Sequence, residues 1–190
     1  MSIEFININK AFNGEKIFHD FNATIKMNQI TSIMGESGIG KTTLINILLG
    51  IEKPDSGEII GIENKRVSAV FQEDRLCEEF DCIQNLRLVC DKNISDNELT
   101  KSLEDLGLGD AVNKKVSTLS GGMKRRLAIG RALVFGGDII IMDEPFKGLD
   151  KELYDKIVQL VVENTRNKTL IIITHSLEEA KILGGDILYL

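Results

Sequence analysis

The sequence lacks tryptophan, holds only two prolines and contains no long apolar run. Its longest apolar stretches, at residues 138–143 and 170–174, are far shorter than the roughly 18–20 residues that a helix needs to cross a bilayer. The N-terminal segment MSIEFININK also lacks the cationic and then apolar pattern of a signal peptide. We therefore expect a protein that stays in the cytoplasm and has no transmembrane segment.

Cysteine is scarce, and positive charge is not in excess. The three cysteines are Cys77, Cys82 and Cys90, and with an odd count and no nearby histidine we expect reduced thiols and no metal site. The chain has 23 basic and 29 acidic residues, for a net charge of −6. This balance argues against binding to nucleic acid, because proteins that bind nucleic acid usually have a basic surface patch. It leaves ATP open as a ligand, because phosphate sites rely on backbone N–H groups and a few local cations.

Short runs of β-branched residues alternate with longer segments of helical period, which is the pattern of a mostly parallel α/β sheet. The length of 190 residues suits one domain. Strand signals stop between residues 73 and 135, so we predict an inserted helical lobe there and a core formed by residues 1–72 and 136–190. The predicted strands are 3–8, 29–34, 58–60, 67–71, 138–143, 168–174 and 186–190, and the predicted helices are 41–50, 82–90, 96–107, 121–134, 151–164 and 176–183.

A glycine-rich loop lies between the predicted strand 29–34 and the predicted helix 41–50. Glycines let such a loop curl so that its N–H groups and the positive end of the next helix face phosphate oxygens. Lys41 can reach the β- and γ-phosphates, and Thr42 supplies a hydroxyl for Mg²⁺. The pattern G-x-x-x-x-G-K-T is formed by Gly35, Glu36, Ser37, Gly38, Ile39, Gly40, Lys41 and Thr42, and it predicts a site for ATP and Mg²⁺.

Three polar side chains follow two other predicted strands. Asp143 and Glu144 end an apolar strand, and His175 follows the next one. Ligands of parallel sheets bind at the carboxyl ends of the strands, so Asp143 is placed to hold Mg²⁺ and Glu144 to polarise an attacking water. We expect His175 to contact the γ-phosphate or that water. The plainer alternative is a core strand capped by solvated acids beside a structural histidine, and the neighbouring glycine loop argues against it.

Further motifs narrow the class of nucleotidase. Leu119-Ser120-Gly121-Gly122-Met123 resembles the LSGGQ signature of ATP-binding cassette proteins, and Val70-Phe71-Gln72 resembles their Q-loop. The segment from Asp143 to Asp150 looks like Walker B running into the D-loop, and His175 matches the switch histidine. All the motifs arrive in the family's order and span essentially the whole chain. The sequence therefore resembles an ABC transporter ATPase subunit.

This resemblance implies a fold, two cofactors and an assembly. The fold would be a P-loop NTPase core with a mostly parallel sheet, a small antiparallel β subdomain and an inserted α-helical subdomain. ATP and Mg²⁺ would bind to it. ATP binding would close a head-to-tail homodimer in which the P-loop of one copy and the signature of the other enclose each nucleotide. The residues that would contact ATP in trans are Ser120, Gly121, Gly122 and Asp150.

The resemblance also implies roles within one copy. Thr43 would join the glycine loop in binding the nucleotide, and Gln72 would contact Mg²⁺ together with Thr42 and Asp143. Phe12 stands where the family places an aromatic ring that stacks on adenine, with Phe18 as a rival for that role. Met123 departs from the family pattern at the end of the signature, where we expect little loss. Lys147 and Gly148 depart from it in the D-loop and put the fine geometry there in question.

By this resemblance the chain hydrolyses ATP to drive transport through a separate membrane permease, from the inner face of the cell membrane. A substrate-binding protein is a further expected partner. The segments Phe71–Leu76 and Glu144–Phe146 resemble importers of the nitrate, sulfonate and taurine type. Lipoprotein-releasing and peptide exporters remain alternatives. From other classes, a soluble cassette acting on ribosomes or DNA and a small-molecule P-loop kinase remain open, although the latter would not need residues 119–122.

Overall fold

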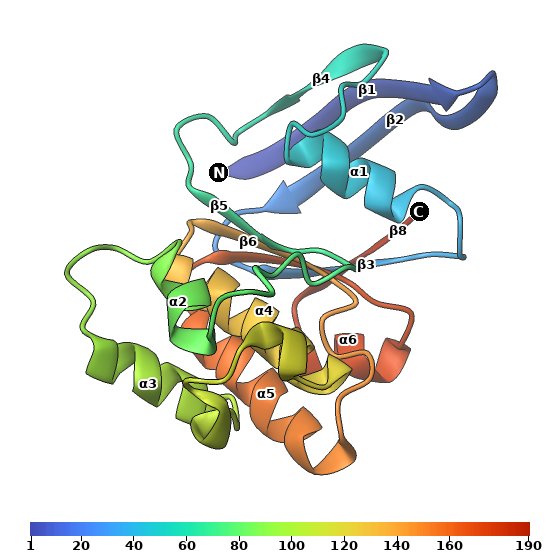
Figure 1. Cartoon of the computed structure of the whole chain (residues 1–190). Helices are drawn as coiled ribbons and strands as arrows, with labels where there is room; N and C mark the ends of the chain where they lie inside the picture. The colour runs from blue at the N-terminus through green and yellow to red at the C-terminus, as the bar shows by residue number, and fades with distance from the viewer.

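The computed structural model describes residues 1–190 and contains two sheets of different kinds (Figure 1). The larger sheet is parallel, with the strand order β5-β6-β7-β3-β8. Its order differs from chain order because β3 lies between β7 and β8. A helical insertion separates β5 from β6 in the chain, although the two strands are neighbours in the sheet. The strands are β3 (Ile30–Met34), β5 (Val67–Val70), β6 (Ile139–Asp143), β7 (Thr169–Ile173) and β8 (Asp186–Tyr189). The α/β fold with a mostly parallel sheet is confirmed.

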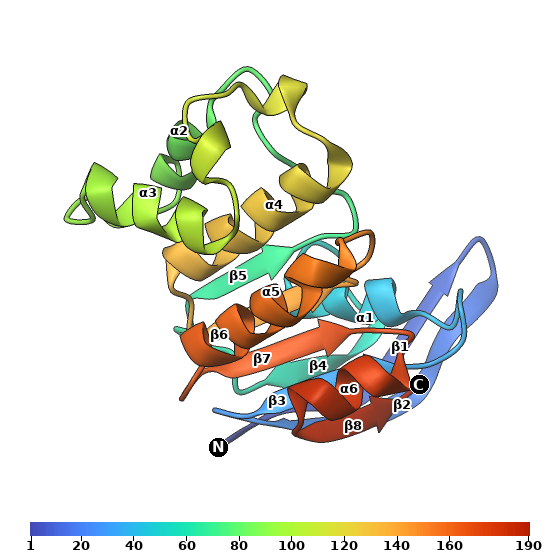
Figure 2. The ribbon, with the colours of Figure 1, turned by 90° about the horizontal axis from the view of Figure 1, so that it is seen from below.

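The two central strands of this sheet are buried on both faces. Alternate residues of a strand point to opposite faces, so Ile139 and Ile141 of β6 enter one core, whereas Ile140 and Met142 enter the other. Helices cover both sides (Figure 2): α1 (Lys41–Leu48) lies on one face, and α4 (Gly121–Phe135), α5 (Lys151–Asn164) and α6 (Leu177–Leu183) lie on the other. This double cover explains why the strands read as continuous apolar runs.

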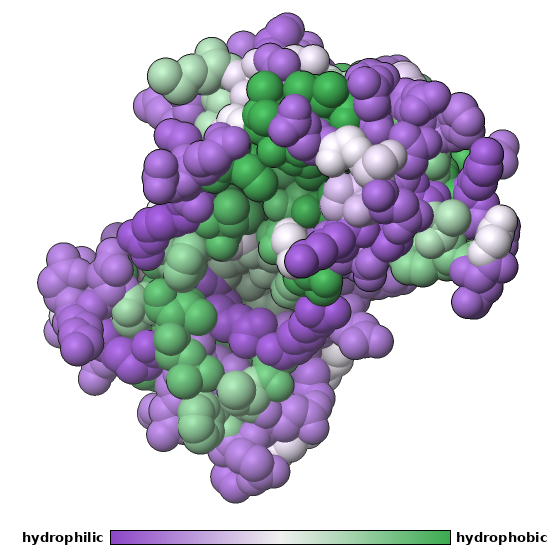
Figure 3. All heavy atoms as spheres, turned by 90° about the horizontal axis from the view of Figure 1, so that it is seen from above, coloured by the Kyte–Doolittle hydropathy of each residue, from purple (hydrophilic) through white to green (hydrophobic).

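The smaller sheet is antiparallel, with the order β2-β1-β4, and packs on the α1 side of the molecule. Its strands are β1 (Ser2–Phe12), β2 (Glu15–Lys26) and β4 (Ser56–Ile60). The turn between β1 and β2 has positive φ at Asn13 and Gly14, as a type I′ hairpin requires. No strand was predicted at residues 15–26, because the pairing of β1 with β2 shifts register and breaks the alternation of apolar residues. Seen from above, polar side chains form most of the outline of the molecule, and apolar residues are visible in the middle of the view (Figure 3).

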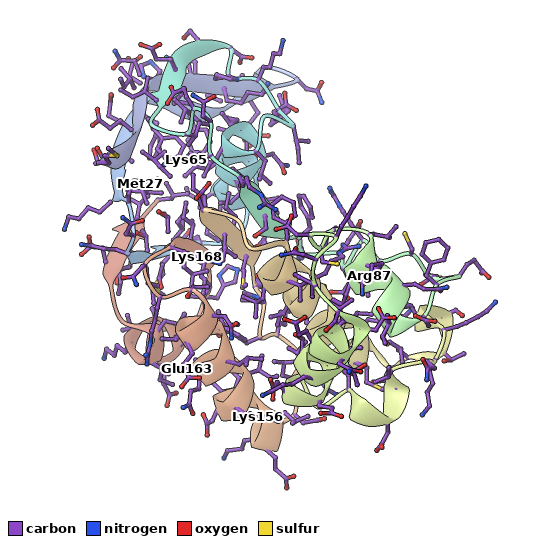
Figure 4. All side chains as sticks on the ribbon, turned by 90° about the vertical axis from the view of Figure 1, so that its left-hand side faces the viewer. Met27, Lys65, Arg87, Lys156, Glu163 and Lys168 are labelled. Carbon is purple, nitrogen blue, oxygen red and sulfur yellow. The ribbon has the colours of Figure 1, made fainter.

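The helical lobe consists of α2 (Cys82–Arg87), α3 (Asp96–Asp105), two short 3-10 helices (Gly109–Ala111 and Val116–Thr118) and α4. Capping boxes begin α2 at Asp81 and α3 at Ser95, which satisfies N–H groups that a helix start leaves free. Arg87, labelled in Figure 4, closes the end of α2 by donating to the Ile94 carbonyl at 2.6 Å. The helices lie where the sequence places them, with α2 and α3 ending a few residues early. The assignment of residues 73–135 to a separate subdomain stays a prediction.

None of these helices combines the length and the apolar character that a membrane span requires.

Candidate nucleotide site

The glycine loop connects β3 to α1 and lies on top of the antiparallel sheet's apolar side chains. Gly40 has a φ of 111°, and a Cβ there would lie 2.6 Å from Ile17 and 3.0 Å from the ring of Phe18. Only glycine fits this close approach, so the loop is pressed against β2 at its last turn before α1. Phe18 is buried beneath the loop and cannot stack on a base, whereas Phe12 is 42% exposed.

Lys41, the first residue of α1, curls back into the loop that precedes it. Its Nζ donates to the carbonyl oxygens of Gly35 at 2.9 Å and Glu36 at 2.7 Å, and the side chain is almost fully buried. A buried ammonium needs such acceptors in place of water. The contacts hold the cation at the centre of the loop, where triphosphate oxygens can replace or supplement the carbonyls.

Thr42 and Asp143 meet across the edge of the sheet. The Thr42 hydroxyl donates to Asp143 Oδ2 at 3.1 Å, although the two residues are 101 positions apart. Burial raises the pKa of Asp143, and the hydrogen bond from Thr42 opposes that rise. A divalent cation placed beside this carboxylate would favour its ionised form, so the pair suits Mg²⁺, which takes oxygen ligands.

Glu144 follows Asp143 in an uncommon backbone conformation, with a φ of 47°. Its Oε1 lies 2.8 Å from Nε2 of His175, and its Oε2 lies 2.7 Å from Nζ of Lys147. Burial acts to raise the pKa of Glu144, but the hydrogen bonds and charges of Lys147 and His175 outweigh it and the pKa falls below its usual value. Glu144 is therefore a carboxylate held in its ionised form, with both oxygens occupied.

These groups share one pocket of about 190 Å³ at the carboxyl ends of β3, β6 and β7. Ten of the residues that line it were predicted from the sequence, and Ile173 is the only lining residue that was not. The pocket is lined by Ser37, Gly38, Gly40, Lys41, Thr42, Thr43, Gln72, Asp143, Glu144, Ile173 and His175. Gly35, Glu36 and Ile39 belong to the same loop without lining it, and Phe12 also lies outside the lining.

The signature residues lie elsewhere, at the start of α4. Ser120 caps the helix, accepting a hydrogen bond from the Met123 N–H at 3.3 Å, and both Ser120 and Gly121 are exposed. Gly121 lines a second pocket of about 170 Å³ together with Gln72, Glu144 and Lys147. None of Ser120, Gly121 and Gly122 lines the pocket of Lys41. Asp150, the residue before α5, is exposed as well.

Two residues of the site were missed by the sequence analysis. Lys147 was noted only as a departure in the D-loop, yet it forms an ion pair with Glu144. Arg125, on α4, donates to the backbone that carries Asp143 and Glu144. A basic residue three positions after a carboxylate on a tight turn could have suggested the first contact. No sequence signal indicated the second, because it joins residues 18 and 19 positions apart through the fold.

A glycine loop between a parallel strand and a helix, with a lysine in the loop and two successive carboxylates on a neighbouring strand, defines a P-loop nucleotide-hydrolysing fold. Comparison with known proteins narrows this class. The profile of the family described as "ABC transporter" matches residues 18–147. The chain belongs to this family, and it is an ATP-binding cassette ATPase.

Curated relatives agree with this assignment. The spermidine/putrescine import ATP-binding protein PotA of Fusobacterium nucleatum is 36% identical over 97% of this chain, which spans 54% of that relative's length. The aliphatic sulfonates import ATP-binding protein SsuB 2 of Pseudomonas syringae is 34% identical, covering 94% of this chain and 78% of the relative. The taurine import ATP-binding protein TauB of Roseobacter denitrificans is 36% identical, covering 90% and 70%.

A solved structure shares the whole fold. It is the dimeric post-hydrolysis state of an ATP-binding cassette bound to ADP and Pi, with a TM-score of 0.84 and 30% identity. The match covers 99% of this chain and 94% of that chain. The expected P-loop core, antiparallel β sheet and helical insertion are thus all present in this chain.

Proposed function

We propose that this chain is the ATP-hydrolysing subunit of a transporter and drives transport through a separate membrane permease. The single observation that carries the proposal is the pocket in which Lys41, Thr42, Asp143, Glu144 and His175 converge. Cationic, metal-binding and carboxylate groups at one sheet edge match the needs of phosphoryl transfer to water.

ATP would bind with its phosphates along the glycine loop. The loop N–H groups and the N-terminus of α1 face the same anion, and Lys41 supplies the one buried cation of the loop. Phe12 is the aromatic ring exposed for stacking on adenine, since Phe18 is buried. Thr43, which follows Thr42 in α1, lines the same pocket.

Mg²⁺ fits the oxygen donors present. The Thr42 hydroxyl and the Asp143 carboxylate are already paired, and the side-chain amide of Gln72 lines the same pocket. When bound, the ion would neutralise charge on the transferred phosphoryl group. Gln72 is exposed on the segment that leads into the helical lobe, so it would also sense whether the nucleotide is bound.

Hydrolysis would begin when Lys147 leaves Glu144. Lys147 is 70% exposed, so its ammonium can return to water and free Oε2 to accept a hydrogen bond from the attacking water. The water oxygen bonds to the γ-phosphorus as the bond between the γ-phosphorus and the bridging oxygen breaks. ADP leaves with those electrons, and the Glu144 carboxylate accepts the proton that the water loses. His175 would hold the other carboxylate oxygen and lies on the same pocket wall.

The signature residues would act on a second copy of the chain. Ser120, Gly121 and Gly122 are at the start of a 15-residue helix whose positive end suits the γ-phosphate, yet they do not line the pocket of their own Lys41. The dimeric cassette with ADP and Pi shows that this fold pairs. A head-to-tail homodimer would close on ATP and open after cleavage, with Asp150 crossing between copies.

The transport role follows from the relatives, which are named as import ATP-binding proteins for different substrates. They favour this role over a soluble cassette acting on ribosomes or DNA. The permease would select the cargo, with the help of a substrate-binding protein, and would hold the chain at the inner face of the cell membrane. Exposed Phe80 and Leu88 of the helical lobe are candidates for contacting it.

The test is purification of the tagged chain from gently solubilised membranes. We expect a membrane protein with several spanning helices to copurify, and Phe80→Asp or Leu88→Asp to release it. The matched control is Leu177→Asp, since Leu177 is an exposed residue of α6 outside the helical lobe. Copurification with ribosomes or nucleic acid in place of a membrane protein would contradict the transport role.

A further inference from the structure

Arg125 sits one turn into α4, and its guanidinium uses every donor it has. Nε donates to the Pro145 carbonyl at 3.1 Å, one terminal nitrogen donates to Phe71 O at 2.5 Å and Asp74 Oδ1 at 3.1 Å, and the other donates to the carbonyls of Asp143 and Glu144. A guanidinium has five N–H donors in a fixed plane, so all are satisfied. The side chain is only 6% exposed.

The backbone acceptors lie just beyond the ends of two neighbouring strands. β5 ends at Val70 and β6 at Asp143, so the carbonyls of Phe71, Glu144 and Pro145 have no ladder partner. Buried carbonyls of this kind need a donor, and one guanidinium supplies it to both strand ends at once. The result fixes the position of the segment that carries Glu144 relative to the segment that carries Gln72.

The backbone conformation of Glu144 depends on the hydrogen bonds that Arg125 donates. A non-glycine residue with a φ of 47° is strained and persists only when its surroundings hold it. The Glu144 N–H is fixed by the Ile173 carbonyl at 3.0 Å, and the carbonyl on the other side of the residue is fixed by Arg125 at 2.8 Å. The Lys147 N–H also donates to this carbonyl, at the longer distance of 3.3 Å, so Arg125 contributes one of three backbone contacts that hold Glu144 and aim its carboxylate into the pocket.

The next residue along the helix provides a natural contrast. Arg126 is equally buried, but it donates to the carbonyls of Leu106 and Gly107 at 2.6 and 2.7 Å, at the end of α3. The two arginines thus point in different directions from α4. Arg126 ties the helix to its own lobe, whereas Arg125 ties the same helix to the catalytic strand ends.

From this geometry we propose that Arg125 is a positioning residue for hydrolysis, which holds Glu144 in its working conformation and couples it mechanically to α4 and Gln72. The inference rests on the proposed function, because Glu144 is the group it acts through. One rigid helix then carries both the signature residues and the support of Glu144. Docking of the signature on a second copy would be transmitted to the carboxylate that orients water.

The test compares Arg125→Gln and Arg125→Lys with Arg126→Gln in steady-state ATP hydrolysis. We expect both Arg125 variants to lower kcat by about 10²-fold with little change in KM, because a misplaced Glu144 leaves ATP binding intact. Lysine keeps the charge but cannot form the planar fork, so it should not rescue kcat. Arg126→Gln should lower thermal stability while kcat stays within a few-fold of the unmodified chain.

A second measurement separates positioning from damage to the fold. In a Glu144→Gln background, single-turnover hydrolysis should be unchanged by Arg125→Lys, because the group through which Arg125 acts is already removed. Additive losses in the double variant, or full kcat in folded Arg125→Lys, would overturn the proposal. Should Arg125→Gln not fold, Asp74→Ala removes the only side-chain acceptor of Arg125 and should give a smaller loss of kcat at unchanged KM. An unmodified chain without ATPase activity would instead reject the proposed function itself.

Discussion

The sheet edge and the start of α4 are both built for phosphate, but only one of them has a complete pocket. At the sheet edge, Lys41, Asp143 and Glu144 converge from three elements of a single chain. At the start of α4, Ser120 and Gly121 are exposed and lie outside that pocket. In the proposed mechanism, one chain therefore holds two unlike half-sites, and hydrolysis uses the second half-site of another copy.

Lys41→Ala should produce the largest effect, because it empties the complete half-site of its buried cation. We expect kcat for ATP hydrolysis to fall by about 10²- to 10³-fold, the usual cost of removing a preorganised group that stabilises charge in the transition state. A phosphate-release assay measures this. Lys156→Ala is the matched control, since Lys156 is an exposed residue of α5 far from the loop (Figure 4). Equal activity of the two variants would remove Lys41 from the site.

Gly122→Asp disrupts the other half-site, the signature at the start of α4. It should lower kcat on the order of 10²-fold, as the loss of one oxyanion-hole donor does. A carboxylate there would face the phosphates of the opposite copy, whereas the affinity of a single copy for ATP should be unchanged. The sharper measurement mixes this variant with Lys41→Ala, because a mixed pair contains one P-loop and one signature that are intact. We expect activity to return on mixing. A mixture as inactive as its parts would mean that the half-sites do not combine.

The helical lobe and the P-loop pocket should also differ in how a substitution affects stability and ATP affinity. Leu103 of α3 is fully buried in the helical lobe, so Leu103→Ala should lower the free energy of unfolding by about 2–5 kcal/mol. Because Leu103 does not line the P-loop pocket, ATP affinity measured below the unfolding transition should not change. Leu88→Ala serves as the control, since Leu88 is 53% exposed, and it should leave urea denaturation nearly unaltered. Loss of ATP affinity in Leu103→Ala would show that the two regions are not separable.

The smallest effect concerns the cysteines of the helical lobe. Burial raises the pKa of the Cys82 thiol to about 11, whereas Cys77 is exposed. The thiolate is the reactive form, so at pH 8 a maleimide should label Cys77 rapidly and Cys82 only after denaturation. Mass spectrometry of timed digests measures the order. Equal labelling of both thiols in the native chain would indicate that the lobe opens readily.

Much of this molecule could be predicted because its chemistry is local in sequence. The spacing of the loop from Gly35 to Thr42 predicts a phosphate-binding loop, and the position of Asp143-Glu144 after an apolar run predicts two carboxylates at the edge of the sheet. The buried strands were also plain, since a strand covered on both faces is apolar throughout. By contrast, β2 escaped prediction because bulges near Asn7 and Asp20 break its alternation, and both residues take positive φ.

The remaining features depend on contacts between distant segments. The choice between Phe12 and Phe18 needed burial, because both rings have suitable chemistry and only the fold covers one of them. From the sequence, an arginine at position 125 of a helix indicates only a polar helix face. In the fold, α4 packs against β5 and β6, and the Arg125 side chain reaches the carbonyls of Phe71 and Asp143. Residue type alone cannot show which of two adjacent arginines reaches the catalytic strands.

The central claim is that ATP joins two half-sites from different copies, and the Glu144→Gln chain tests it most directly. This variant should bind ATP and Mg²⁺ but cleave ATP far more slowly than the unmodified chain, so the closed state should accumulate. Molar mass measured by light scattering after size exclusion should double on addition of ATP and Mg²⁺, and should remain that of one copy with ADP. A variant that binds ATP stoichiometrically and keeps the mass of a single chain would contradict the account.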